Sequence, residues 1–162
     1  MPAIRIGHIR VRYGRLDIEA SVALQYLHVS AACAERICAL LPNLRNHLCV
    51  NRTAEGPRFA DEIVGTELAH LLEHVIIELQ GQAYWGVRPA PRFIGHTSWA
   101  EELAVTRAQG IALMRTTVTF ADDLVALQAV KEAVTLVEWA VGDDPGEMPD
   151  VAAAVSRLRA IM

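Results

Sequence analysis

The chain of 162 residues is long enough for one well-packed domain and too short for two full-sized catalytic domains. Its residues are 52% apolar and 21% charged, which is far from the polar, charge-rich composition of a disordered chain. The net charge is −4, and no cluster of Lys or Arg forms the positive surface that nucleic acids require. We therefore expect one folded domain over residues 1–162 that does not bind nucleic acid.

The cellular location is predicted from what the sequence lacks. No apolar run approaches the roughly 18 residues that are needed to cross a bilayer, and residues 1–5 lack the apolar segment of a signal peptide. We therefore expect a cytoplasmic protein without membrane contact. The three cysteines, Cys33, Cys38 and Cys49, form no Cys-x-x-Cys pair, so we expect neither a disulfide framework nor a cysteine zinc site. They are interpreted as small buried side chains.

The first third of the chain combines strand and helix patterns. Residues 4–13 alternate apolar and polar side chains and slip by one place near Gly7, which predicts a half-buried strand with a bulge. Helical spacing, at least over the second half of the segment, predicts a helix from about residue 19 to residue 41, and Pro42 ends it. A loop follows with a short strand around residues 48–50, and then a helix or turn over residues 57–64.

The strongest helix prediction covers residues 67–80, with Thr66 as its N-cap and Gly81 at the position of a C-terminal glycine cap. Residues 84–98 have the composition of one or two short strands with a turn. The tetrapeptide Ser98-Trp99-Ala100-Glu101 matches a capping box, which predicts a helix over residues 98–116.

Two further helices are predicted in the last third, an amphipathic one over residues 122–139 and a short one over residues 149–162. The elements together predict an α+β fold, a helix-rich single domain with a small, mostly antiparallel sheet. The alanine-rich later helices could also bury an interface between two copies of the chain.

The central predicted helix contains an HxxEH motif, His70-Leu71-Leu72-Glu73-His74, which is the inverted form of a zinc-protease signature. Residues four apart lie on one helix face at about 5–6 Å, so the rings of His70 and His74 can reach one zinc ion. Glu73 lies beside them and can take a proton from water. On a helical wheel these residues lie opposite the leucine-rich face, so we expect them to face a cleft or solvent. The alternative is a solvated polar face with incidental histidines.

A catalytic zinc ion usually has three protein ligands, so a third ligand must come from another segment. Glu102 and Glu101 are the candidates. Glu102 is preferred because Glu101 would be occupied by the capping box. The alternative is that both carboxylates only complement the positive end of a helix.

Three other polar residues are assigned weaker roles. Glu78 lies about 12 Å along the helix axis from His70, so we expect it to support the site or bind substrate rather than share the ion. Together with Glu67 it would favour a cationic substrate. His96 could stabilise an oxyanion, and an ordinary loop histidine is the alternative.

The order of several short segments resembles the amino-terminal domain of cyanophycin synthetases. These segments are Leu41-Pro42-Asn43-Leu44 with His47 and Cys49, Glu55-Gly56, Gly65-Thr66-x-Leu68-x-His70-x-x-Glu73-His74, Glu78-Leu79-Gln80, Trp99-x-Glu101-Glu102, and residues 155–162. In that family the domain precedes an ATP-grasp domain and a Mur-ligase-like domain, which make an aspartate–arginine polymer. In some members it resembles a metallopeptidase that cuts the polymer into primers. The resemblance implies that His70 and His74 bind zinc, that Glu73 is the base, and that Glu101 or Glu102 completes the site.

We therefore predict a freestanding hydrolase with one zinc ion per chain that cleaves peptide or isopeptide bonds in a peptide or polymer substrate of the cyanophycin type. Synthetase activity is not expected, because the chain has no G-x-x-x-x-G-K-[ST] loop. The alternative from a different class is a non-catalytic binding or assembly module related to the same domain. A metal carrier with an exposed site is a third interpretation.

Overall fold

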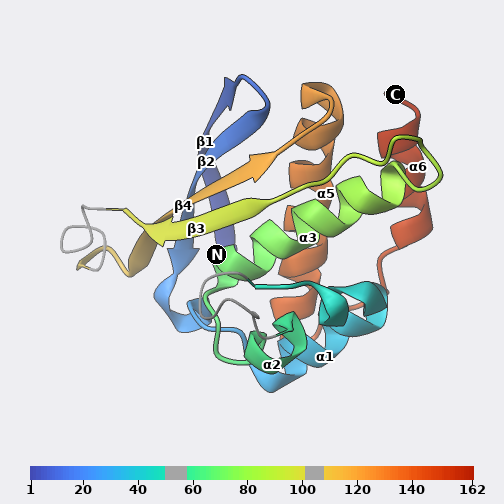
Figure 1. Cartoon of the computed structure of the whole chain (residues 1–162). Helices are drawn as coiled ribbons and strands as arrows, with labels where there is room; N and C mark the ends of the chain where they lie inside the picture. The colour runs from blue at the N-terminus through green and yellow to red at the C-terminus, as the bar shows by residue number, and fades with distance from the viewer. Residues whose placement is uncertain (50–57, 101–107) are drawn as a thin grey trace.

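The computed structural model describes residues 1–49, 58–100 and 108–162, and it has the predicted α+β architecture (Figure 1). Four strands form one antiparallel sheet in the order β1-β2-β4-β3. The strands are β1 (Ile4–Arg12), β2 (Arg15–Ala23), β3 (Gly95–Trp99) and β4 (Ile111–Thr119). The helices are α1 (Ala31–Leu40), α2 (Phe59–Glu62), α3 (Leu68–Ala83), α5 (Asp123–Val141) and α6 (Val151–Arg159), with 3-10 turns at Leu24–Tyr26 and Pro42–Asn46.

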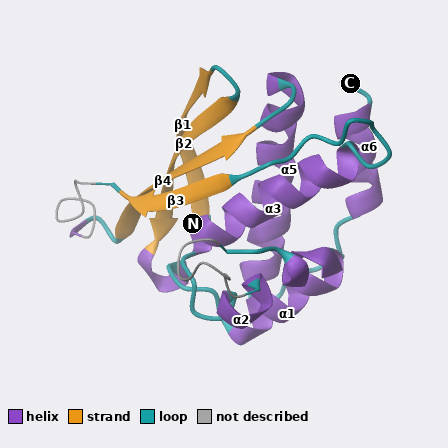
Figure 2. Ribbon diagram, viewed as in Figure 1, coloured by secondary structure: helices purple, strands orange, loops and turns teal. Residues whose placement is uncertain are grey.

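One face of the sheet packs against helices α3 and α5, which also pack against each other (Figure 2). The alternation in β2 produces this face, because Leu16, Ile18, Ala20 and Val22 are buried while the residues between them are more exposed. Helix α3 therefore contacts the sheet on one side and helices α5 and α6 on others. None of the described helices is long and apolar enough to cross a membrane.

Several predicted elements are confirmed. Strand β1 has its register shift between Ile6 and His8, where the bulge was expected. Helix α2 lies within the predicted segment 57–64, and α5 and α6 occupy the two predicted C-terminal helices. The strand expected around residues 48–50 is reduced, in the described part of that segment, to one bridge between Leu48 and Arg58.

Two predicted helices are wrong where the structure has strands. Residues 19–23 of the helix predicted over residues 19–41 belong to β2, and Leu24–Tyr26 form a 3-10 turn. The second half of that segment contains α1, as expected. Ser98, the expected start of a second helix, lies in β3 opposite Arg115 of β4. Alternate residues of β4 are buried against α3, and pairing with strands on both sides outweighs the local capping signal. Glu101, the other half of that capping box, lies outside the described residues.

Helix α3 is shifted from the predicted boundaries. It begins at Leu68, with Glu67 at the N-cap position and no side-chain cap. The hydroxyl group of Thr66, the expected cap, lies 2.8 Å from Nδ1 of His70 instead. The helix continues through Gly81 to Ala83, and the glycine with left-handed backbone that follows it is Gly86, at φ 89°.

Candidate metal centre

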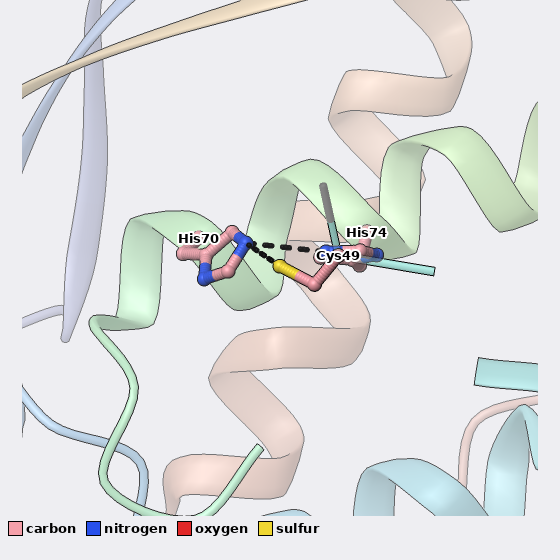
Figure 3. Close-up of side chains that lie close together, drawn as sticks. All are labelled: Cys49, His70 and His74. Atoms are coloured by element: carbon pink, nitrogen blue, oxygen red, sulfur yellow. Dashed lines mark hydrogen bonds between the residues drawn. The ribbon is translucent and has the colours of Figure 1, made fainter. Parts of the chain in front are cut away.

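The two histidines of α3 direct ring nitrogens at each other. Nε2 of His74 lies 3.2 Å from Nε2 of His70, and Sγ of Cys49 lies 3.3 Å from the same His70 atom (Figure 3). The three candidate ligand atoms lie within 4.8 Å of one another, and all three side chains are buried. Nitrogen and sulfur ligands at tetrahedral angles around one zinc ion are about 3.3–3.6 Å apart, which follows from zinc–ligand distances of about 2.0–2.3 Å. The distances of 3.2 and 3.3 Å are close to this range and the donor types are ones that bind zinc, so the group could hold a metal ion.

Cys49 adds a ligand that the sequence did not predict. It is buried, as expected for a small apolar side chain, but its sulfur also lies beside the two histidines. The expectation that no cysteine would belong to a candidate zinc site is therefore wrong. Because 21 residues separate Cys49 from His70, no short spacing motif marks the group, and only the loop after the Pro42–Asn46 turn brings it to α3.

The Nδ1 atom of each histidine ring has a polar contact that orients the ring. Thr66 contacts Nδ1 of His70 at 2.8 Å, and Nδ1 of His47 lies 3.0 Å from Nδ1 of His74. Phe59, fully buried at the start of α2, stacks on the His74 ring with centroids 3.8 Å apart and meets the His70 ring edge-on at 5.5 Å. These contacts involve Nδ1 of both rings, and the two Nε2 atoms face each other.

His47 links the candidate ligand His74 to a buried carboxylate. Its Nε2 lies 2.7 Å from Oε2 of Glu78, and Glu78 also accepts hydrogen bonds from Asn43 and Gln82, each at 2.9 Å. Burial raises the pKa of Glu78, but the hydrogen bonds from His47, Gln82 and Asn43 together outweigh it and lower the pKa below its usual value. Glu78 therefore stays ionised and supports His47. His47 lies in one of the segments that resemble the family domain, but no spacing pattern predicts a role for it, because its contacts with His74 and Glu78 span 27 and 31 residues.

Burial also keeps His74 neutral. It lowers the pKa of His74 from 6.5 to about 2, and proximity to His70 and His47 adds to this effect. Neutral imidazole is the form that binds a metal ion.

Glu73 is held by strand β3. Its side chain is 4% exposed, and the hydroxyl group of Thr97 donates a hydrogen bond of 2.6 Å to Oε2. Burial raises the pKa of Glu73 from 4.5 to about 7, against the opposing effect of the Thr97 bond. A Cβ atom added at Gly95 would lie only 2.6 Å from Cγ of Glu73, so a glycine is needed where the strand crosses this carboxyl group.

The expected polar face of α3 is buried. His70, Glu73, His74 and Glu78 are each at most 8% exposed, so the prediction that this face could be solvated is wrong. The alternative prediction, a cleft, agrees with a cavity of about 310 Å³ whose wall includes Cys49, His70, Glu73 and His74. The helical wheel could not distinguish the two, because residues 42–49 and α2 cover this face through long-range packing.

A second cavity lies on the other side of His70. It has a volume of about 360 Å³ and is lined by Asp61, Glu62 and Glu67, together with Thr97 and Trp99 of β3. Glu67 is therefore placed near the centre, as an acidic wall residue.

The structure does not bring His96, another predicted site residue, to this centre. His96 is exposed on β3 and lines neither cavity, because side chains alternate along the strand and Gly95 and Thr97 take the face toward Glu73. Glu101 and Glu102, the predicted third ligands, lie outside the described residues.

The fold and the site define an α+β domain with a buried cysteine and histidine group that could bind a metal ion. The chain belongs to the family described as the cyanophycin synthase-like N-terminal domain, whose model matches residues 15–141. This range contains every residue of the candidate centre, which agrees with the family resemblance of the sequence. A search of curated proteins found no match.

Proposed function

We propose that this domain is a zinc-dependent hydrolase that cleaves peptide or isopeptide bonds of an aspartate–arginine polymer of the cyanophycin type. The observation that carries the proposal is one cavity whose wall contains the paired histidines, with Nε2 atoms 3.2 Å apart, and the buried carboxyl group of Glu73. Membership of the cyanophycin synthase-like family supports this choice of substrate.

The residues of the centre divide into ligands and a proton carrier. His70, His74 and Cys49 would hold the metal ion, and these donor types are ones that zinc sites use. A zinc ion supplies Lewis-acid activation of water and of the scissile carbonyl group. Glu73 accepts a proton from the attacking water and passes it to the nitrogen of the leaving amine. Thr97 engages Oε2, so this exchange takes place at Oε1.

The charge beside the centre supports a cationic substrate. Asp61, Glu62 and Glu67 line the cavity next to His70, and this cavity suits the guanidinium groups of such a polymer. Glu78, the other residue expected to attract a cation, is instead committed to His47, Asn43 and Gln82.

A second candidate is the non-catalytic binding or assembly module. The position of Cys49 beside the two histidines favours this candidate, because structural zinc sites often use cysteine ligands. A fourth protein ligand added to Cys49, His70 and His74 would leave no coordination position for water or substrate. In that case the metal stabilises the fold and Glu73 has no role in turnover.

The test is metal analysis of untagged protein combined with incubation with aspartate–arginine polymer. A hydrolase has close to one zinc ion per chain and shortens the polymer. The Glu73→Gln variant keeps its zinc and loses turnover, and His70→Ala loses the zinc. His8→Ala, which removes an exposed histidine of β1, is the matched control and changes neither property. Wild-type protein that holds zinc and leaves the polymer intact would favour the module.

A further inference from the structure

The outer edge of strand β3 is next to the candidate centre. β3 is the last strand of the sheet, and within the described residues no other strand pairs with its outer side. We propose that this edge binds the main chain of the substrate as an added β-strand. The inference rests on the proposed hydrolase function, and it specifies how an extended polyamide substrate is held.

The main-chain groups available on this edge follow from the pairing with β4. The amide of Ala100 donates to the carbonyl of Leu113, and the amide of Thr119 donates to the carbonyl of Ile94. In an antiparallel pair such residues alternate with residues whose amide and carbonyl groups face the other way. Gly95, Thr97 and Trp99 therefore direct their main-chain amide and carbonyl groups to the outer edge.

Two of these residues, Gly95 and Thr97, also place the outer edge of β3 beside the candidate metal centre. Thr97 bonds Glu73 at 2.6 Å, and the missing side chain of Gly95 makes room for Glu73. Gly95 belongs to the wall of the 310 Å³ cavity and Thr97 to that of the 360 Å³ cavity, while His70 belongs to both walls. A chain added along β3 would run from one cavity to the other, past the proposed base.

The two edges of the sheet differ in their protection against strand addition. β1, at the opposite edge, carries Arg5, Arg10 and Arg12 and has a bulge near Gly7, which are features that discourage pairing with another chain. β3 has the sequence Gly-His-Thr-Ser-Trp, with no Lys, Arg, Asp, Glu or Pro and a regular register. The unprotected edge is the one that lies beside Glu73.

Strand length and charge indicate which chain occupies the edge. The five residues of β3 span about 17 Å, which is enough for about five residues of an extended chain. The cavity at the Trp99 end contains Asp61, Glu62 and Glu67, so its charge complements a cationic side group. The occupant we assign is therefore an extended oligo-aspartate backbone that carries arginine on its side-chain carboxyl groups.

The experiment follows main-chain amides by NMR hydrogen exchange in the zinc-loaded full chain with Glu73→Gln, which prevents cleavage. The probe is an oligomer of four aspartates, each with arginine on its β-carboxyl group. A second probe is the same oligomer with alternate main-chain amides N-methylated. We expect slower exchange at the amides of Gly95, Thr97 and Trp99. The amides of β1, the strand at the protected edge, are the internal control, and we expect their exchange rates to stay the same. Loss of one main-chain hydrogen bond should weaken binding by about fivefold or more for each methylated amide.

Each outcome separates this inference from the proposed function, because cleavage of the unmodified oligomer is measured independently with wild-type protein. Cleavage without protection of the three amides, or equal binding of the methylated oligomer, overturns edge binding and leaves the hydrolase intact. Protection without cleavage supports edge binding and overturns the hydrolase. Absence of any binding overturns the inference, because the proposal commits to this substrate.

Discussion

Replacement of Gly95 by alanine tests whether β3 sets the position of Glu73. The new Cβ would lie 2.6 Å from Cγ and 2.7 Å from Oε1 of Glu73, whereas ordinary contacts begin at 3.4 Å, so the carboxyl group or the strand must move by about 0.8 Å. Overpacking of this kind costs about 1–3 kcal/mol of unfolding free energy. A displacement near 1 Å in a catalytic group can reduce turnover by about 100-fold.

The assay combines urea denaturation, zinc content and polymer cleavage for Gly95→Ala. We expect lower stability and strongly reduced turnover, with zinc content unchanged because no candidate ligand is touched. Gly81→Ala is the matched control, since a Cβ there meets no atom within 4 Å and alanine in a helix is worth up to about 1 kcal/mol over glycine. Gly95→Ala protein with wild-type stability and turnover would refute the argument that this close contact fixes the carboxyl group.

Three further predictions concern the scaffold. Glu138 accepts hydrogen bonds from the main-chain amides of Ala3 and Ile4 at 3.1 and 2.7 Å. Glu138→Ala should therefore lower the unfolding free energy, measured by urea denaturation, by about 2 kcal/mol. An unchanged free energy would contradict this prediction. Hydrogen bonds from Arg157 hold the pKa of Glu132 below its ordinary 4.5, so the stabilisation is present above about pH 4.5 and is lost as the pH falls through the lower folded-state pKa. The Tm difference between wild type and Glu132→Gln should therefore shrink in acid, and a constant difference would exclude this cause. Burial raises the pKa of Cys33 to about 11, so iodoacetamide at pH 8 should label it, by mass spectrometry, only after unfolding.

Local periodicity predicted part of the fold correctly. The bulged strand β1 and the helices α5 and α6 were predicted because the spacing of apolar residues within each segment is enough to indicate its secondary structure. Residues 111–116, most of strand β4, were predicted as helix because the helix assigned to the capping box at Ser98 was extended through them. What makes it a strand is its pairing with both β2 and β3, and a window of ten residues does not contain that information.

The same division applies to the candidate centre. His70 and His74 could be predicted as a pair because one helical turn brings them together, and the structure places their Nε2 atoms 3.2 Å apart. Cys49 and His47 approach α3 only through the path of the chain around the Pro42–Asn46 turn. Their contacts span 21 and 27 residues, so no spacing rule could have assigned their roles.

The energetics of α3 also argue that this arrangement serves a function rather than stability. Burying ionisable groups is costly, and apolar side chains of similar size often stabilise a core as well or better. Here His70, Glu73, His74 and Glu78 are all buried in one helix, and each has a polar partner. Glu73 is held at a glycine that leaves just enough room for it, and His74 is held in its neutral, metal-binding form. A core selected only for stability would need none of these polar groups, whereas a metal centre with a proton carrier needs all of them in fixed positions.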